Sequence, residues 1–278
     1  MKNNFTRENV YFESEKGMLY KGDSLTMLKA LPDACVDAII TDPPYNIGET
    51  AKLCKKGNKI VSNKEMWGHF EPENTADWLG YLDKVFKEFH RVVKGSLIIF
   101  YDRFEITRIK DMLGQAGFYP KNLLCIVKKN PLPHFRKNGF RSDFELALYC
   151  QKIKGKDTFN FLSQDQMKSV DYYVIGKKRT THPTEKPLEV IKKYVNIITK
   201  EGDIVLDAFI GSGTTALACE QTGRKWLGIE KDETYCQMVK RTMTNDRTEQ
   251  DLQRGLFGGD ETYSGRRKKY KTYYQQKK

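Results

Sequence analysis

Two short stretches of the chain combine residue types that could do chemistry. The first, TDPPYN at 41–46, follows the apolar run VDAII, so Asp42, Pro43, Pro44 and Tyr45 stand where a buried strand should end. Each proline fixes φ and lacks an N–H, which makes the Asp42 carboxylate and the Pro43 carbonyl a stiff pair of acceptors. Such a pair suits a nitrogen with two N–H donors, as in the exocyclic amine of a nucleobase, and Tyr45 could stack on the ring. A rigid turn would explain a Pro–Pro pair taken alone.

The second stretch, DAFIGSGTTA, fits the pattern G-x-G-x-x-G/A from Gly211 to Ala216. Its glycines allow a cofactor to approach the backbone at a helix N-terminus. Glu230 ends the next predicted strand, and 230 minus 207 places it 23 residues after Asp207. That is near the spacing of about 20 expected for an acid that binds ribose hydroxyls. The glycine pattern alone fits a nicotinamide cofactor equally well.

A third polar cluster, HPTEKP at 182–187, precedes an apolar pattern of helical period, with Pro187 in the first turn. The helix start accounts for the apolar positions only. His182, Thr184 and Lys186 are left to line a pocket, where Lys186 could neutralise a carboxylate.

Apolar runs and helical periods alternate along the chain in the manner of an α/β protein. We expect strands at 36–41, 96–102, 123–129, 144–152, 204–206 and 226–229, and helices at 78–93, at 104–117 and from about Thr214. This alternation predicts a Rossmann-like, doubly wound and mostly parallel sheet.

Composition narrows the class of protein. The 278 residues carry a net charge of +12 and a pI of about 9.2, which favours an acidic partner such as nucleic acid, although a basic surface can also serve solubility alone. The six cysteines are scattered, without a CxxC pair, and we expect reduced thiols. No apolar run is long enough for a signal peptide or a membrane span, so we expect a soluble, cytoplasmic protein without a membrane partner.

Taken in order, these motifs resemble a known family, the S-adenosylmethionine-dependent DNA amino-methyltransferases of the permuted beta class, in which the catalytic motif precedes the glycine motif. Here TDPPYN precedes HPTEKP and DAFIGSGTT. GDSLTMLKALPDACVDAII at 22–40 and KKNPLPHFRKNGFRSDFELALYC at 128–150 also look like adenine-modifying members. The resemblance covers residues 17–150 and 181–240 and implies a permuted methyltransferase fold.

The resemblance implies a role for each matching residue. Asp42 and the Pro43 carbonyl would accept from the target amine, Pro44 would shape the loop, and Tyr45 would stack on the flipped base. The cofactor, S-adenosyl-L-methionine, would be bound by a larger set: Asp23 at its adenine, Glu230 at its ribose, His182, Thr184 and Lys186 at its methionine, and Asp207, Phe209, Gly211, Gly213 and Thr214 around the methionine and sugar. No metal site is expected.

We divide the chain into five parts on these grounds. They are a polar leader (1–16), a catalytic half (17–151), a short target-recognition insertion (152–181), a cofactor-binding half (182–245) and a basic, flexible tail (246–278). Residues 49–70 would assist target recognition.

The expected function is site-specific methylation of the N6 amine of a flipped-out adenine in DNA, by direct transfer. An N4-cytosine enzyme is the nearest alternative, but that type tends to place Ser where this chain has Asp42. RNA as substrate, an NAD-dependent oxidoreductase and an inactive nucleic-acid-binding protein are further alternatives. No cysteine follows a proline, which disfavours a cytosine-C5 enzyme. Expected partners are DNA, a cognate restriction endonuclease and a second copy of the chain in a homodimer.

Overall fold

The structure, a computed structural model, describes residues 9–45, 54–56, 59–61, 75–131, 133–134, 137–176, 179–180 and 185–244. Within these residues, one large sheet is formed by β1 (Val10–Glu13), β2 (Gly17–Lys21), β3 (Ala38–Thr41), β6 (Leu97–Tyr101), β7 (Tyr119–Lys128), β8 (Phe144–Gln151), β9 (Val170–Tyr173), β10 (Ile204–Asp207) and β11 (Lys225–Glu230). The helices are α1 (Ser24–Ala30), α3 (Thr75–Val92), α4 (Ile106–Gln115), α5 (Leu188–Ile198), α6 (Thr214–Gln221) and α7 (Glu233–Thr244). A separate hairpin pairs β4 (Cys54–Lys56) with β5 (Lys59–Val61).

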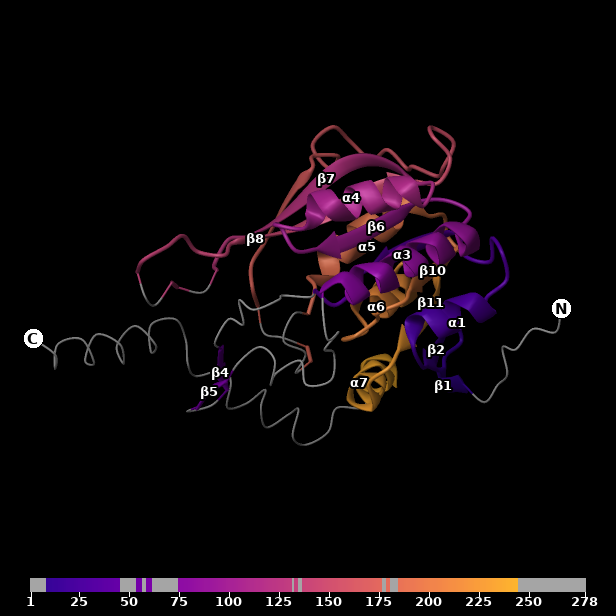
Figure 1. Cartoon of the computed structure of the whole chain (residues 1–278), viewed down its shortest axis with the longest axis horizontal. Helices are drawn as coiled ribbons and strands as arrows, with labels where there is room; N and C mark the ends of the chain where they lie inside the picture. The colour runs from indigo at the N-terminus through magenta and orange to yellow at the C-terminus, as the bar shows by residue number, and fades with distance from the viewer. Residues whose placement is uncertain are drawn as a thin grey trace, which may run out of the picture.

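The strands of the large sheet lie in the order β1-β2-β11-β10-β3-β6-β8-β7-β9 (Figure 1). Neighbours from β2 to β6 are parallel, β8 is antiparallel to both β6 and β7, and β1 is antiparallel to β2. The expected mostly parallel α/β sheet is confirmed. The carboxyl ends of β2, β11, β10, β3, β6 and β7 therefore meet at a single edge, which we call the catalytic edge.

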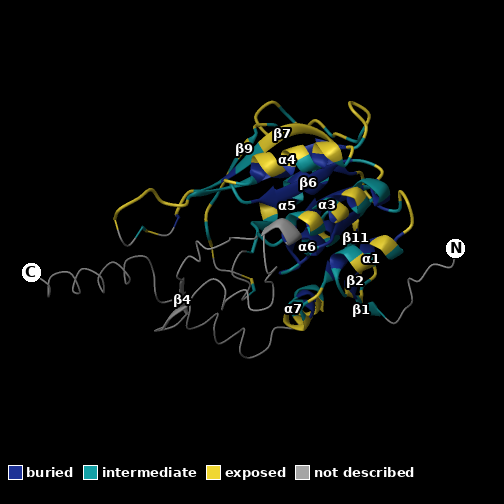
Figure 2. Ribbon diagram, viewed as in Figure 1, coloured by how far each residue is buried: buried dark blue, intermediate teal, exposed yellow. Residues whose placement is uncertain are grey.

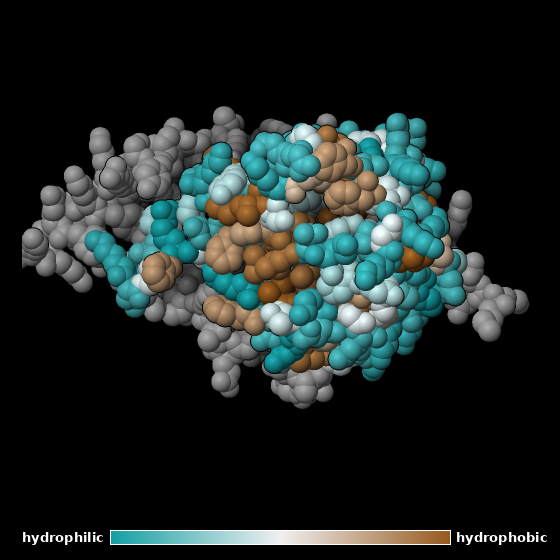
Figure 3. Space-filling model, turned by 90° about the horizontal axis from the view of Figure 1, so that it is seen from above, coloured by the Kyte–Doolittle hydropathy of each residue, from teal (hydrophilic) through white to brown (hydrophobic). Residues whose placement is uncertain are grey.

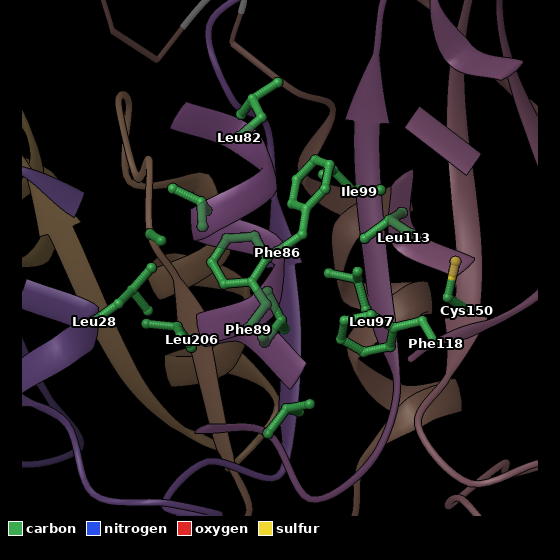
Figure 4. Packing of buried hydrophobic residues seen from close by; sticks show 14 of the residues in the cluster. Leu28, Leu82, Phe86, Phe89, Leu97, Ile99, Leu113, Phe118, Cys150 and Leu206 are labelled. Carbon is green, nitrogen blue, oxygen red and sulfur yellow. The ribbon is translucent and has the colours of Figure 1, made fainter. Parts of the chain in front are cut away.

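Helices cover both faces of this sheet because successive strand residues point to opposite sides. Ile39 packs with α1, α3 and α4, whereas its neighbour Ile40 packs with α5, α6 and α7. Figure 4 shows Phe86 and Phe89 of α3 lying between Leu206 and Leu97, and Figure 2 shows the buried central strands. The two apolar layers hold the central strands in place, and these strands carry the side chains at the catalytic edge.

The structure contains two edge strands that the sequence analysis did not expect. Residues 10–13, which we placed in a polar leader, form β1 against β2. Residues 170–173, within the expected target-recognition insertion, form β9 and pair with β7. Both strands are short and lie at sheet edges, where only part of each residue is buried, so neither gives the continuous apolar run that revealed the central strands.

In the part of the chain that the structure describes, no helix is long and apolar enough to cross a membrane. The surface is mixed: Figure 3 shows apolar side chains gathered in the middle of the face seen from above, with polar ones around them. Exposed apolar residues include Leu123 of β7 and Val170 of β9.

Candidate active site

The candidate site lies at the catalytic edge, where open α/β sheets bind ligands. Asp42 directly follows β3, Asp207 ends β10, and Glu230 ends β11, and these strands are neighbours in the sheet. Pro43 and Pro44 have no N–H with which to extend the pairing of β3 with β6, so β3 ends at Thr41. The sequence thus stops the strand where the carboxylate must leave the sheet.

Asp42 and Tyr45 contact each other within the motif. The Tyr45 hydroxyl donates to Asp42 Oδ1 at 2.6 Å, and its ring lies against Tyr101 with the centroids 5.1 Å apart. Burial is the largest cause and the nearby Asp42 carboxylate the next; together they raise the pKa of Tyr45 well above its usual value. Tyr45 is therefore a neutral hydroxyl, and one of the two oxygens of Asp42 is covered by it.

The other oxygen of Asp42 is held by Lys186. The Lys186 ammonium lies 2.7 Å from Asp42 Oδ2 and 2.9 Å from Glu145 Oε2, and only 10% of the side chain is exposed. Burial alone would lower the pKa of Lys186, but the Asp42 and Glu145 carboxylates outweigh it and hold that pKa well above its usual value. The ammonium also lies 4.8 Å from the Phe100 ring centroid. The sequence suggested that Lys186 could neutralise a carboxylate, and its contacts with Asp42 and Glu145 show that it does.

Glu145, the second residue of β8, is a member of this cluster that the sequence did not reveal. Its Oε1 lies 2.7 Å from the Lys128 ammonium. Burial would raise the pKa of Glu145, but Lys186 and Lys128 lower it to about 2, so the carboxylate is ionised. The available signal was a glutamate inside the apolar run FELALYC, because a charge in such a strand needs a partner.

Asp207 is buried without an ion pair to any described residue. Its Oδ1 accepts from the Thr41 hydroxyl at 2.8 Å and from the Phe209 N–H at 3.2 Å. Burial raises the pKa of Asp207 to about 7, against the effect of these hydrogen bonds and that of Thr215. A cationic ligand beside this buried carboxyl would lower its pKa toward the ordinary value and favour its ionised form.

The glycine loop lies beside Asp207 and closes on Glu230. Gly211 and Gly213 have φ of 49° and 78°, values that favour glycine, and Thr214 begins α6. Glu230 Oε2 accepts from the Gly211 N–H at 3.0 Å, while Oε1 accepts from the N–H groups of Lys231 and Asp232, each at 2.9 Å. Burial raises the pKa of Glu230. The loop is thereby held against the end of β11.

Asp23 reaches the same edge but already has local partners. As the N-cap of α1 it accepts from the Thr26 N–H at 3.0 Å, and its second oxygen accepts from the Tyr81 hydroxyl at 3.0 Å. The preceding Gly22 N–H donates to the Glu230 carbonyl at 2.8 Å, so Asp23, after β2, lies near Glu230, the last residue of the neighbouring β11.

Arg179 is a second residue that the sequence did not single out. Its guanidinium donates to Thr214 Oγ1 at 3.0 Å and lies 2.7 Å from Glu185 Oε1. The only signal was a basic run, GKKRTT, that resembles any solvated surface segment. His182 and Thr184, expected beside Lys186, lie outside the described residues.

Comparisons with known proteins agree with this geometry. Residues 36–241 match the family model described as DNA methylase. The chain is 30% identical over 257 residues to the type II methyltransferase M2.LlaDCHI of Lactococcus lactis subsp. cremoris, covering 86% of this chain and 93% of that one. It is 28% identical over 244 residues to the type II methyltransferase M.HinfI of Haemophilus influenzae, covering 81% and 67%.

Solved structures show the same fold. The M1.HpyAVI–SAM complex is 31% identical, covers 81% of this chain and 99% of that chain, and superposes with a TM-score of 0.61. The cytosine-N4-specific PvuII DNA methyltransferase has a TM-score of 0.67 at 19% identity, with 88% and 93% covered, which is a likeness of fold. With a family match over most of its length, a charged cluster at Asp42 and a glycine loop at the adjacent strand end, the chain belongs to the DNA methylase family.

Proposed function

We propose that the protein methylates the N6 amine of adenine in DNA, with S-adenosylmethionine as the methyl donor. The observation that carries the choice of base is Asp42 at the end of β3, where amino-methyltransferases of the N4-cytosine type tend to have Ser. Family membership favours a DNA methyltransferase over the nicotinamide alternative. An N4-cytosine enzyme would use the same acceptors on a different amine and is the second candidate.

An aromatic amine is a weak nucleophile because its lone pair is delocalised into the ring. Hydrogen bonds from both amino hydrogens, one to Asp42 Oδ1 and one to the Pro43 carbonyl, would concentrate electron density on the nitrogen. Lys186 holds Oδ2 of Asp42 at 2.7 Å and leaves the Oδ1 side to the amine. The base must displace the Tyr45 hydroxyl from Oδ1 as it enters, which frees the Tyr45 ring to stack on it.

The residues around the glycine loop fit the proposed cofactor. Asp207 is a buried carboxylate without a counter-charge among the described residues, and the cofactor is cationic. Glu230 could accept from ribose hydroxyls, and the Gly211–Gly213 backbone allows close approach. When bound there, the cofactor would supply a methyl group activated by its sulfonium.

The amine must lose a proton in forming the methylated product. Asp42 Oδ1 is the nearest acceptor in this arrangement, because Lys186 is already protonated and Tyr45 is a neutral hydroxyl. The protein's contribution is thus to extrude, position and desolvate the amine and to receive its proton, without a covalent enzyme intermediate.

The test is to identify the labelled base. Incubation with methyl-labelled S-adenosylmethionine and unmethylated plasmid DNA, followed by digestion to nucleosides and mass analysis, should give N6-methyladenine. N4-methylcytosine would keep the chemistry but overturn the choice of base. Label in RNA but not in DNA would overturn the substrate.

The partners follow from the same proposal. DNA is the substrate, and the type II names of two relatives support a restriction endonuclease of matching specificity. We also propose a homodimer, for which sedimentation should give about twice the 32.3 kDa chain mass.

A further inference from the structure

The β7–β8 connection leaves the sheet directly beside the candidate site. Lys128, the last residue of β7, contacts Glu145, and Glu145 contacts the lysine that holds Asp42. The connection starts at the catalytic edge because β7 runs parallel to β6 and β3 across the intervening β8. Figure 1 shows it projecting well beyond the ends of the strands, and Figure 2 shows that it is largely exposed.

The described part of this loop displays one aromatic side chain outward. Phe140 is fully exposed, more so than any other large apolar side chain among the described residues. Behind it the turn is folded: the Lys137 N–H donates to the His134 carbonyl at 3.1 Å, and a Cβ on Gly139 would lie 3.4 Å from His134 Nε2. A fully solvated phenylalanine buries no area in the free protein, so its ring is available to contact a partner.

The charges beside Phe140 indicate which partner this is. Lys137 and Arg141 flank it and are exposed, and Arg103, which follows β6, donates to Ser142 Oγ at 2.9 Å. The Arg141 guanidinium also donates to the Pro131 carbonyl. Cations in the same loop as an exposed ring suit a polyanion with a stacked interior, because the cations can contact phosphates while the ring contacts bases.

We propose that Phe140 is a wedge that inserts into the base stack of duplex DNA while the target base occupies the site at Asp42. This inference rests on the proposed function, since an enzyme of this kind must take its base out of the duplex. Extrusion leaves a gap in the stack and two unstacked neighbours. An aromatic side chain delivered from the rim of the site can fill that gap, as apolar wedges do in other DNA-binding proteins.

Turnover on unmethylated plasmid DNA is the first test, read as total methyl label whichever base carries it. Phe140→Ala should lower kcat/KM for DNA by about tenfold to a hundredfold, as expected for the loss of one stacking contact. Phe140→Trp should remain within about threefold of the wild type, because it restores an aromatic face. Affinity for S-adenosylmethionine, measured by calorimetry, should not change in either variant.

Tyr119 provides the matched control. It is an exposed aromatic residue on the same strand, but at the opposite end of the ten-residue β7, about 30 Å from the loop. Tyr119→Ala should leave kcat/KM for DNA unchanged. Wild-type turnover in Phe140→Ala, or an equal loss in both alanine variants, would overturn the wedge.

A second measurement does not need turnover and so separates this inference from the proposed function. Phe140→Trp and Tyr119→Trp are titrated with an unmethylated plasmid fragment, and the fluorescence of the wild type is subtracted. The tryptophan at position 140 should be strongly quenched by stacking on bases, whereas the one at position 119 should not. Equal quenching at the two positions would contradict the proposed role of Phe140, whether the enzyme methylates adenine, cytosine or RNA.

Discussion

The fold raises the pKa of Asp207, a buried carboxyl at the candidate site. Its pKa lies near 7 in the folded protein, against about 3.9 in an unfolded chain. A raised pKa stabilises the protein fully below pH 4, and this stabilisation is lost as pH rises through 7, because the unfolded state gives up its proton first. The shift of about 3 units corresponds to about 4 kcal/mol.

We therefore expect the free energy of unfolding of the wild type, relative to Asp207→Asn, to fall by up to about 4 kcal/mol between pH 4 and 8. Urea unfolding of both proteins without cofactor, at four pH values across this range, measures the difference. A difference that does not vary with pH would show that Asp207 is not buried as an isolated carboxyl.

Residues of the site were predictable from the sequence where their chemistry depends on local spacing. Asp42, Gly211 and Glu230 each occupy a fixed place relative to a strand end, and the structure puts all three at the catalytic edge. Glu145 and Arg179 were not predictable, because their importance comes from partners 41 and 35 positions away in the chain.

At the scale of elements, the start of α5, the end of β3 and the start of β8 are joined through Lys186. Its removal would leave two carboxylates without their shared cation. We expect Lys186→Met to destabilise the fold by about 3 kcal/mol at pH 8, as measured by urea unfolding. The loss should shrink toward pH 4, where Glu145 of the variant can take up a proton.

Two further variants make this prediction specific. Lys192→Met removes an α5 lysine whose one ion pair among the described residues is with the exposed Glu189, and it should cost less than about 0.5 kcal/mol. Adding Glu145→Gln to Lys186→Met should recover part of the lost stability. Equal losses for Lys186→Met and Lys192→Met would mean that the cluster does not join these elements.

The end of β11 and the glycine loop are also linked through one side chain, that of Glu230. Glu230 accepts from three backbone N–H groups, one of them in the loop. Glu230→Gln should lower S-adenosylmethionine affinity about tenfold or more, since hydrogen bonds to a carboxylate are lost. Calorimetric titration measures this, with Glu233→Gln on α7 as the control. Equal affinities for both variants would exclude Glu230 from the cofactor site.

Elements were predictable in proportion to their burial. The central strands have apolar runs and the helices have apolar stripes, so their ranges matched closely. β1, β2 and β9 were missed, as were α1 and α7. β1 and β9 are edge strands held by pairing with their neighbours, which no local pattern records, and only two of the five residues of β2 are buried.

For the whole molecule, the relevant quantity is its excess of positive charge. A protein with a net charge of +12 that binds the DNA backbone should release counterions as it binds. We expect affinity for a non-cognate duplex to fall linearly on a plot of log K against log salt, with a slope of about −0.9 for each phosphate neutralised. Fluorescence anisotropy between 50 and 200 mM salt provides the measurement, and a slope near zero would contradict a backbone contact.

The assembly of the site is also a property of the whole chain. Asp42 and Asp207 are 165 residues apart (207 minus 42), yet β3 and β10 pair directly. The order of the motifs in the sequence implied this proximity only through the family resemblance, since periodicity does not state which strands become neighbours.

The most direct test of the account is a single-turnover measurement on Asp42→Ala. Methyl transfer to unmethylated plasmid DNA and S-adenosylmethionine affinity are measured on the same preparation. Transfer should fall by at least about a hundredfold, the scale of losing one charge-stabilising contact in an active site, while cofactor affinity stays within about threefold. An Asp42→Ala enzyme that transfers methyl groups at the wild-type rate would contradict the central claim that the amine is activated at this carboxylate.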